Sequence, residues 1–337
     1  MKLESSAING KNVLLTGGTG SFGKAFTKYV IENHNPNRFT IFSRDELKQF
    51  EMAQKFSPEQ YPFIQYSLGD VRDRARLVRV LDGVDTVIHA AALKQVPAAE
   101  SNPTEAISTN VHGAMNVIDA CIDRGVKKVV ALSTDKACNP INLYGATKLC
   151  SDKLFIAGNN YSGSHQTRFA VVRYGNVVGS RGSVIPFFYS MKEKGEIPIT
   201  DPEMTRFFIT LTDGVKLVIR ALENMVGGEI FVPKIPSMNI MDLARTIAPQ
   251  VKTKVIGIRP GEKLHETMIS VDDARNTLEY EKFYVILPQK QNMVASQTET
   301  VNGGRRVPEG FQYSSNTNQI WLKESELLQM LDQPGDH

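Results

Sequence analysis

Cysteine, long apolar runs and an excess of charge of one sign are all scarce in this 337-residue chain. Only 3 cysteines occur, and none forms a C-x-x-C pair, which argues against a disulfide framework and fits a reducing compartment. No apolar run approaches the ~18 residues of a membrane-spanning helix, and residues 1–10 lack the pattern of a signal peptide, so we expect a cytosolic protein. The net charge of +3 comes without a basic stripe, so we expect neither nucleic acid nor a membrane as a partner.

What the chain does have is a regular alternation of apolar runs and amphipathic segments of helical length over its first 175 residues. This alternation is typical of a parallel sheet covered by helices. We therefore predict the α/β class, with a Rossmann-like doubly wound parallel sheet in residues 1–175 that is completed by about 205–235. Residues 176–204 and 236–337 are expected to form a smaller α/β lobe.

The apolar runs also predict individual elements. The predicted strands of the sheet are 12–16, 39–42, 63–68, 85–92, 129–132, 169–173 and 228–232. In the smaller lobe the pattern predicts helices near 187–194, from Ile240 onward and at 323–331, and a short strand at 255–258. The role of residues 289–306 stays open.

Glycines spaced three apart follow the first predicted strand. The spacing is wider than the first step of G-x-G-x-x-G, but it still provides a tight turn, close backbone approach to a pyrophosphate and close packing of the helix predicted at 24–31. The sequence therefore predicts a dinucleotide site, and a glycine turn without a ligand is the alternative. The predicted cofactor-binding residues here are Thr16, Gly17, Thr19, Gly20, Ser21, Phe22 and Gly23.

The end of the second predicted strand selects between NAD and NADP. Ser43 and Arg44 come first, and Asp45 follows. The planar donors of Arg44 suit a 2′-phosphate and Ser43 adds a hydroxyl, so we predict NADP. In the alternative, Arg44 is a solvated charge and Asp45 binds the ribose hydroxyls of NAD.

Two further strand ends complete the predicted cofactor site. Asp70 could accept a hydrogen bond from the adenine amino group while Val71 packs on the ring, although the spacing equally allows Asp70 to be a helix N-cap. The small residues Ala90 and Ala91 let a cofactor lie flat over the sheet. His89 is expected to be packed and hydrogen-bonded, and no metal site is predicted, because this histidine has no partner at metal-ligand spacing.

Reactive side chains are concentrated after the fifth predicted strand. In an open parallel sheet, the carboxyl ends of the strands are where ligands bind. Tyr144 and Lys148 are four residues apart and so share a helix face, where the ammonium can stabilise a phenolate. The predicted catalytic residues are Thr134, Asp135, Lys136, Tyr144 and Lys148.

Together these residues resemble the extended short-chain dehydrogenase/reductase family, whose members act on nucleotide sugars. The resemblance rests on the glycine turn, Asp70-Val71, His89-Ala90-Ala91, Asn110, and Tyr144 with Lys148. Within that family, Thr134-Asp135-Lys136 is similar to the triplet of the inverting UDP-N-acetylglucosamine 4,6-dehydratases, which begin pseudaminic acid synthesis. The retaining hexose 4,6-dehydratases usually carry Asp-Glu in place of Asp-Lys. The runs 91–97, 173–187, 205–208 and 259–266 match the same inverting group.

The resemblance implies a tightly bound NADP that is regenerated at each turnover, and UDP-N-acetylglucosamine as substrate. It adds Lys94 and Asn110 to the cofactor site, and also Tyr144 and Lys148, of which Lys148 can hydrogen-bond the nicotinamide ribose. It also implies residues that bind the nucleotide sugar, although each single arginine, and Lys94, could instead be a solvated charge. These residues are Lys94, Thr134, Asn176, Arg181, Val184, Thr205, Arg206, Arg259 and Glu262. Because members of the family commonly associate, a homo-oligomer is expected, either a hexamer or a dimer or tetramer.

The implied reaction assigns a role to each catalytic residue. Tyr144 takes the proton of the sugar C4 hydroxyl, and Thr134 hydrogen-bonds near that oxygen. Lys136, with a pKa lowered by burial beside other cations, removes the C5 proton, while protonated Asp135 releases the C6 hydroxyl as water; these two roles are exchangeable. Inversion at C5 gives UDP-2-acetamido-2,6-dideoxy-β-L-arabino-hexos-4-ulose. A UDP-N-acetylhexosamine 4-epimerase of the same family and a non-catalytic NADP-sensing protein are the alternatives.

Overall fold

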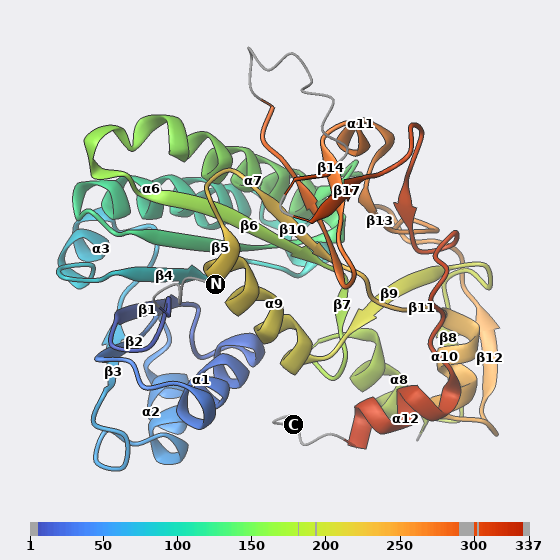
Figure 1. Ribbon diagram of the computed structural model, residues 1–337. Coiled ribbons are helices and arrows are strands. Elements are labelled where there is room, and N and C mark those ends of the chain that lie inside the picture. Colours follow the sequence, from blue (N-terminus) through green and yellow to red (C-terminus); the bar gives the residue numbers. More distant parts are fainter. Residues whose placement is uncertain (1–5, 181, 193, 290–299, 302, 333–337) are drawn as a thin grey trace.

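The computed structural model describes residues 6–180, 182–192, 194–289, 300–301 and 303–332. Within these ranges the main sheet has 11 strands, in the order β16-β17-β14-β15-β10-β6-β5-β4-β1-β2-β3 (Figure 1). The strands from β3 to β10 run parallel, which confirms the predicted α/β class and Rossmann-like sheet. Their bounds are β1 (Asn12–Thr16), β2 (Arg38–Ser43), β3 (Ile64–Leu68), β4 (Thr86–His89), β5 (Lys128–Thr134), β6 (Arg168–Tyr174) and β10 (Ile230–Pro233).

The parallel strands agree with the predicted apolar runs to within about two residues at each end, apart from the end of β4. This strand ends at His89 rather than at Ala92. The Ala90 N–H still donates to the Thr16 carbonyl of β1 (3.2 Å), but the N–H of Ala91 donates to the Thr16 side-chain hydroxyl (3.3 Å) and not to a backbone carbonyl, so the chain leaves the sheet there. The small residues after β4 therefore form a loop at the carboxyl end of the sheet.

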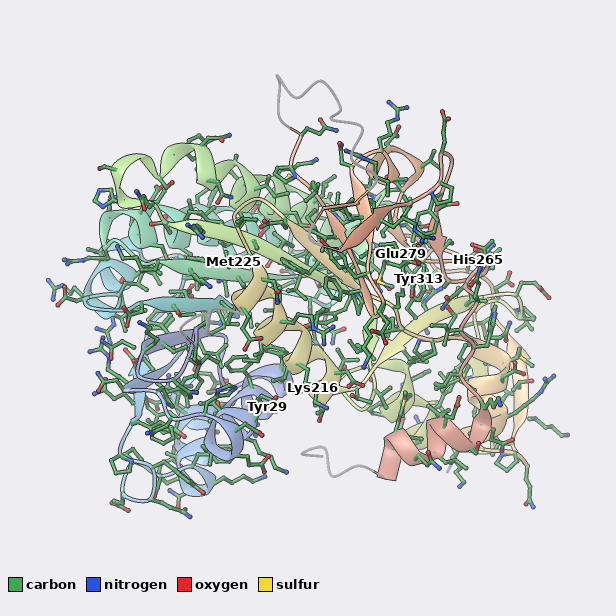
Figure 2. The ribbon with its side chains drawn as sticks, in the orientation of Figure 1. Tyr29, Lys216, Met225, His265, Glu279 and Tyr313 are labelled. Atoms are coloured by element: carbon green, nitrogen blue, oxygen red, sulfur yellow. The ribbon has the colours of Figure 1, made fainter. Side chains whose placement is uncertain are left out.

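Helices cover both faces of the sheet (Figure 1). α1 (Ser21–Asn33) and α9 (Leu211–Asn224) pack against each other on one face, where Tyr29 and Lys216 mark the two helices in Figure 2. The other face carries α3 (Arg74–Val80), α6 (Gly113–Asp123) and α7 (Leu143–Tyr161). The connecting helices are α2 (Glu46–Lys55), α4 (Val96–Ser101), α5 (Pro103–Ile107) and the π-helical turn Ser108–His112. No helix in the described ranges is both long and apolar enough to span a bilayer.

The carboxyl-terminal part of the chain returns to the main sheet, which corrects the expectation that all of 236–337 forms a separate lobe. β15 (Phe283–Ile286) pairs antiparallel with β10, and β14, β17 and β16 follow it outward. The apolar sequence of β15 covers an edge of β10 that would otherwise expose unpaired backbone groups. The bounds of the other strands are β14 (Thr277–Glu279), β16 (Thr300–Val301) and β17 (Gly304–Arg306).

A second, smaller hydrophobic core lies beyond the carboxyl ends of the parallel strands (Figure 1). Strand β9 belongs here rather than to the main sheet, so of the predicted 205–235 segment only β10 completes that sheet. The predicted strand at 255–258 is wrong, because β12 ends at Val255 and Gly257 (φ +88°) turns the chain away. The predicted helices are confirmed as α8 (Val184–Lys192), α10 (Ile240–Ile247) and α12 (Glu324–Asp332). The strands are β7 (Asn176–Val177), β8 (Glu196–Ile199), β9 (Thr205–Ile209), β11 (Ser237–Asn239), β12 (Lys252–Val255), β13 (Thr267–Ile269) and β18 (Tyr313–Ser314), and α11 spans Val271–Ala274.

Candidate active site

A cavity of 1220 Å³ lies between the carboxyl ends of the parallel strands and the second core. Ligand pockets usually have about 300–1,000 Å³, so this cavity has room for more than one small ligand. Its wall is shared by the glycine turn, the loops after β2 to β6, the start of α8 and the segment 259–262. The cavity is therefore large enough to hold a dinucleotide and a second ligand in one space.

The glycine turn lines the end of the cavity beside α1. Gly17 has φ +66°, and a Cβ there would lie 2.7 Å from the backbone N of Ala91. A Cβ on Gly23 would overlap the carbonyl oxygen of Gly18, so α1 packs directly on the turn. Gly20, the N-cap of α1, offers no side-chain cap, which leaves the helix N-terminus suited to an anion. This cradle fits the pyrophosphate of a dinucleotide; Gly17, Thr19, Gly20, Ser21, Phe22 and Gly23 all line it.

Two predicted cofactor residues lie behind the cavity wall. The Thr16 hydroxyl is 2.8 Å from His89 Nδ1, and His89 is 1% exposed, which confirms that this histidine is packed and hydrogen-bonded. Asn110 is also buried, with its amide donating to the Leu93 carbonyl (2.9 Å) and to the Thr147 hydroxyl (3.0 Å). Thr16 and Asn110 therefore hold the loop after β4 in place and do not line the cavity.

The loop after β2 presents cations to the cavity. Asp45 caps α2 by accepting from the N–H of Lys48 (3.0 Å) and pairs with the Lys48 ammonium (2.7 Å). Its carboxylate is thus already engaged, although Asp45 lines the cavity together with Ser43, Arg44 and Lys48. The Arg44 guanidinium lies 3.7 Å from the Asp70 carboxylate.

The loop after β3 carries Asp70 and Val71 on the cavity wall. Asp70 accepts hydrogen bonds from the backbone and guanidinium of Arg72, and these outweigh the effect of burial and hold its pKa below the usual range. The alternative role of Asp70 as a helix N-cap is wrong, because Asp73 caps α3. Ala90, Ala91 and Lys94 line the cavity from the next loop, and burial lowers the pKa of Lys94.

The first turn of α7 and the end of β5 meet at the centre of the cavity. Asn142 caps α7 by accepting from the N–H of Gly145 (2.7 Å). A Cβ on Gly145 would overlap the Lys136 carbonyl oxygen, so this glycine lets the helix approach the 134–136 turn closely. Tyr144 is thereby brought to Thr134 and Lys136, and all three line the cavity together with Lys148.

Lys136 lies between carboxylates rather than beside cations. Its ammonium is 3.0 Å from Asp135 Oδ1 and 3.5 Å from Glu266 Oε1, and it donates to Asn176 Oδ1 (3.2 Å). Burial alone would lower the Lys136 pKa, but the two carboxylates outweigh burial and raise it. The expected lowering of this pKa is therefore wrong. Burial raises the pKa of Asp135, which is 0% exposed, and so favours its protonated form.

Tyr144 is half-buried, and the burial of its phenol raises the pKa of this group to about 12. Among the nearby charges, Lys136 lowers the Tyr144 pKa most. The helical spacing had predicted this role for Lys148. Burial lowers the pKa of Lys148, while Asp152 opposes that shift. Asp152 also accepts from Ser133 (2.8 Å) and pairs with buried Arg173 (3.4 Å), so a charged network supports the floor of the site.

The second core contributes the opposite wall. Arg206 is 7% exposed and is oriented by backbone carbonyls, including Thr205 (2.7 Å) and Lys263 (2.9 Å). Asn176, Val184, Arg206, Arg259 and Glu262 line the cavity. Thr205 does not, because its hydroxyl is held by His265 (2.8 Å) and Ser315 (2.7 Å). Arg181 lies outside the described residues.

Glu266 is a cavity residue that the sequence did not single out. It is 2% exposed and lies 3.7 Å from the Lys263 ammonium, which in turn donates to the Cys138 carbonyl (2.6 Å). Its position at the end of the 259–266 run was the only available signal, and spacing could not show that this run folds back onto Lys136.

Comparisons with known proteins agree with this geometry. The model of the polysaccharide biosynthesis protein family matches residues 13–288. The UDP-N-acetylglucosamine 4,6-dehydratase (inverting) of Campylobacter jejuni is 58% identical over 331 residues, covering 96% of this chain and 98% of that protein. The UDP-glucose 4-epimerase of Rickettsia canadensis is 42% identical, with 96% of each chain covered. The crystal structure of Pen from Bacillus thuringiensis superposes with a TM-score of 0.86 at 35% identity, covering 96% of this chain and 97% of that one. The chain therefore belongs to the polysaccharide biosynthesis protein family, within the extended short-chain dehydrogenases/reductases.

Proposed function

We propose that this protein is an inverting UDP-N-acetylglucosamine 4,6-dehydratase that retains NADP through each turnover. The observation that carries the proposal is the contact of Lys136, which lines the cavity together with Tyr144, with Asp135 (3.0 Å), which is fully buried directly behind the cavity wall. A 4-epimerase only oxidises and re-reduces C4, so it needs no acid or base that acts at C5 and C6. A cofactor-sensing protein needs none either. The C. jejuni relative, 58% identical, carries the dehydratase name.

The cofactor part of the proposal rests on the glycine cradle and on the charges after β2. Gly17 lets the turn approach the Ala91 backbone and Gly23 lets α1 approach the Gly18 backbone, which gives the tight turn that a pyrophosphate cradle requires. Arg44 and Lys48 face the cavity, and the carboxylate of Asp45 is engaged in the α2 cap, which favours the 2′-phosphate of NADP. The glycine turn and the residues after β2 would hold NADP, which would supply the hydride acceptor for oxidation at C4 and the hydride donor for reduction at C6.

Each catalytic side chain has a proton to move. Tyr144 accepts the proton of the C4 hydroxyl, and the Lys136 charge beside it favours the phenolate. The C4 ketone acidifies the C5 proton, which Lys136 removes once its ammonium has passed a proton to the Glu266 carboxylate (3.5 Å), because Asp135 already carries a proton. Burial raises the pKa of Asp135 and so favours its protonated form. Asp135 donates this proton to the C6 hydroxyl, which leaves as water.

The second wall of the cavity supplies the nucleotide site. Arg206 and Arg259 present guanidinium groups suited to a diphosphate, and Asn176 and Glu262 add polar contacts. We assign the UDP moiety to this wall and the acetamido sugar to the space above Thr134 and Tyr144.

The decisive experiment is incubation of the purified protein with UDP-N-acetylglucosamine in deuterated water. A dehydratase gives a product lighter by one water, with a 4-ketone, a C6 methyl group, deuterium at C5 and L configuration by NMR. Interconversion with UDP-N-acetylgalactosamine without loss of water would instead identify an epimerase. Binding of NADP and UDP-sugar without any product would identify a sensing protein.

The proposal extends to the cellular setting. The product is the precursor expected for pseudaminic acid synthesis, and we place the enzyme in the cytoplasm as a homo-oligomer. The described cysteines Cys121, Cys138 and Cys150 are free thiols, which agrees with a reducing compartment.

A further inference from the structure

Two buried carboxylates from distant parts of the chain share the Lys136 ammonium. Asp135 follows β5 directly, whereas Glu266 immediately precedes β13. The ammonium is 3.0 Å from Asp135 Oδ1 and 3.5 Å from Glu266 Oε1. Asp135 is 0% exposed and Glu266 is 2% exposed, so water compensates neither charge. Burying an uncompensated carboxylate is costly, and such a group takes up a proton instead.

The cations are unequally divided between the two carboxylates. Glu266 has the Lys263 ammonium at 3.7 Å in addition to Lys136, and Arg206 acts on it as well. Among the described residues, Asp135 forms an ion pair only with Lys136, a cation that it shares. One oxygen of each carboxyl, Asp135 Oδ2 and Glu266 Oε2, has no hydrogen-bond partner, so the two groups differ in their cations and not in this respect. Glu266 is therefore the better compensated anion, and Asp135 is the carboxyl that gains most from a proton.

We propose that Glu266 is the counter-ion of Lys136 and thereby keeps Asp135 protonated, as a positioning residue for the acid that releases the C6 hydroxyl. The role in catalysis rests on the proposed function, whereas the protonation of Asp135 does not. Glu266 fulfils this role without needing to touch the substrate. Its negative charge balances Lys136, so that the Asp135 proton stays in place.

The titration behaviour of the cluster supports this division. Burial tends to raise the pKa of both carboxyls. For Glu266, the cations Lys136, Arg206 and Lys263 outweigh burial and hold the pKa below its usual range. The pKa of Asp135 stays raised, and the Glu266 charge raises it further. The groups that face Asp135 are Thr134, which donates to Oδ1 (2.9 Å), Lys136, Tyr144, Cys138 and Glu266.

The test reads the proton on Asp135 directly, by infrared spectroscopy of the carboxylic-acid C=O stretch in the full-length protein without substrate. Burial also raises the pKa of Asp152, so the Asp135→Asn variant is needed to assign the Asp135 band. In Glu266→Gln, which removes the charge but keeps the shape, we expect the midpoint for loss of the Asp135 band to fall by about 1–3 pH units. An unchanged midpoint in a folded Glu266→Gln protein would overturn the proposal.

Matched variants keep the test decisive. Glu279→Gln removes a carboxylate that pairs with Lys234 (2.7 Å) away from the cavity (Figure 2), and it should leave the midpoint and the turnover unchanged. Glu266→Asp keeps the charge, and its midpoint should lie between those of the wild type and Glu266→Gln. If Glu266→Gln does not fold and Glu266→Asp does, a Glu266→Asp midpoint equal to or above that of the wild type contradicts the proposal.

Activity provides the second readout. In the wild type, the alkaline limb of the kcat/KM profile for dehydration should follow the Asp135 midpoint of the substrate-free protein, and in Glu266→Gln both should move together to lower pH. If the midpoint of the Asp135 band shifts in Glu266→Gln but the protein does not dehydrate UDP-N-acetylglucosamine, the proposed function is refuted and the inference stands. If the midpoint stays fixed in a protein that does dehydrate this substrate, the inference is refuted and the proposed function stands.

Discussion

At the scale of single residues, the site is a set of titratable groups whose environments push their pKa values apart. Burial raises the pKa of Asp135 and lowers that of Lys148, and the carboxylates around Lys136 raise its pKa. Divergent pKa values in one cavity are the physical signature of acid and base roles. The roles follow from the neighbours of each group as much as from its own chemistry.

Replacing Tyr144 by Phe tests the base at C4. Removing the phenol oxygen should lower kcat for dehydration by ~10²–10⁴-fold, the usual contribution of a positioned proton acceptor, while UDP still binds. The measurement is product formation by mass spectrometry together with UDP titration. Tyr161→Phe, on the same helix but 64% exposed, should retain full activity. Turnover of Tyr144→Phe within a few fold of the wild type would reassign the base.

Replacing Arg44 by Ala tests the choice of cofactor. If its guanidinium holds the 2′-phosphate, losing a charge-assisted contact worth about 1.5–3 kcal/mol should weaken NADP binding ~10–100-fold and leave NAD binding unchanged. Calorimetric titration of the cofactor-free protein with both dinucleotides measures this difference. Arg245→Ala, which removes an exposed arginine of α10 that pairs with Asp242, serves as the control. An equal loss for NAD and NADP would contradict a phosphate contact.

At the scale of elements, strand ends and first helical turns decide where the chemistry lies. β1, β4 and β5 end at one edge of the sheet, and α1 and α7 begin there. Glycine makes both junctions possible, because Gly23 allows α1 to touch the turn before it and Gly145 allows α7 to touch the backbone of Lys136.

Replacing Gly23 by Ala tests the first of these junctions. The added Cβ would overlap backbone atoms of Gly18 that cannot move independently, so we expect a lower melting temperature and a loss of dinucleotide affinity of at least ~10-fold. Gly214→Ala is the matched control in α9, where a Cβ meets no atom within 4 Å. There the substitution should stabilise the protein by about 0.5–1 kcal/mol with unchanged binding. Unaltered dinucleotide binding in Gly23→Ala would contradict the cradle.

At the scale of the whole molecule, a large sheet and a second core enclose the cavity between them. Contacts from the second core reach the sheet at the cavity itself, including the donation from Asn142 to the Gly261 carbonyl (2.7 Å) and the Lys136–Glu266 pair. Stability and site geometry are therefore properties of the same interface.

Buried His89 should give the global stability a measurable pH dependence. Burial, aided by the Lys148 charge, lowers the His89 pKa from 6.5 to about 3. Between these values the unfolded chain binds a proton that the folded protein does not, so the free energy of unfolding falls as the pH falls. From about pH 7 to about pH 5 this single group should cost ~2 kcal/mol.

Urea denaturation over this pH range measures the effect. His89→Gln should be less stable than the wild type near neutral pH, because it loses the bond to Thr16, but its stability should vary less with pH. His165→Gln, at an exposed position, should keep the wild-type slope. A His89→Gln slope identical to that of the wild type would show that another group is responsible.

The sequence by itself determined the parallel sheet, the glycine cradle and the residues that follow β5, because each of these depends on local periodicity and on the chemistry of a few adjacent residues. Tertiary structure alone decided that Thr16, Asn110 and Thr205 support the wall without lining it, that 277–286 rejoins the sheet, and that Glu266 meets Lys136. Those outcomes depend on contacts between segments far apart in the chain, and the pKa values of the catalytic groups depend on the same contacts, since burial and neighbouring charges exist only once the chain is folded.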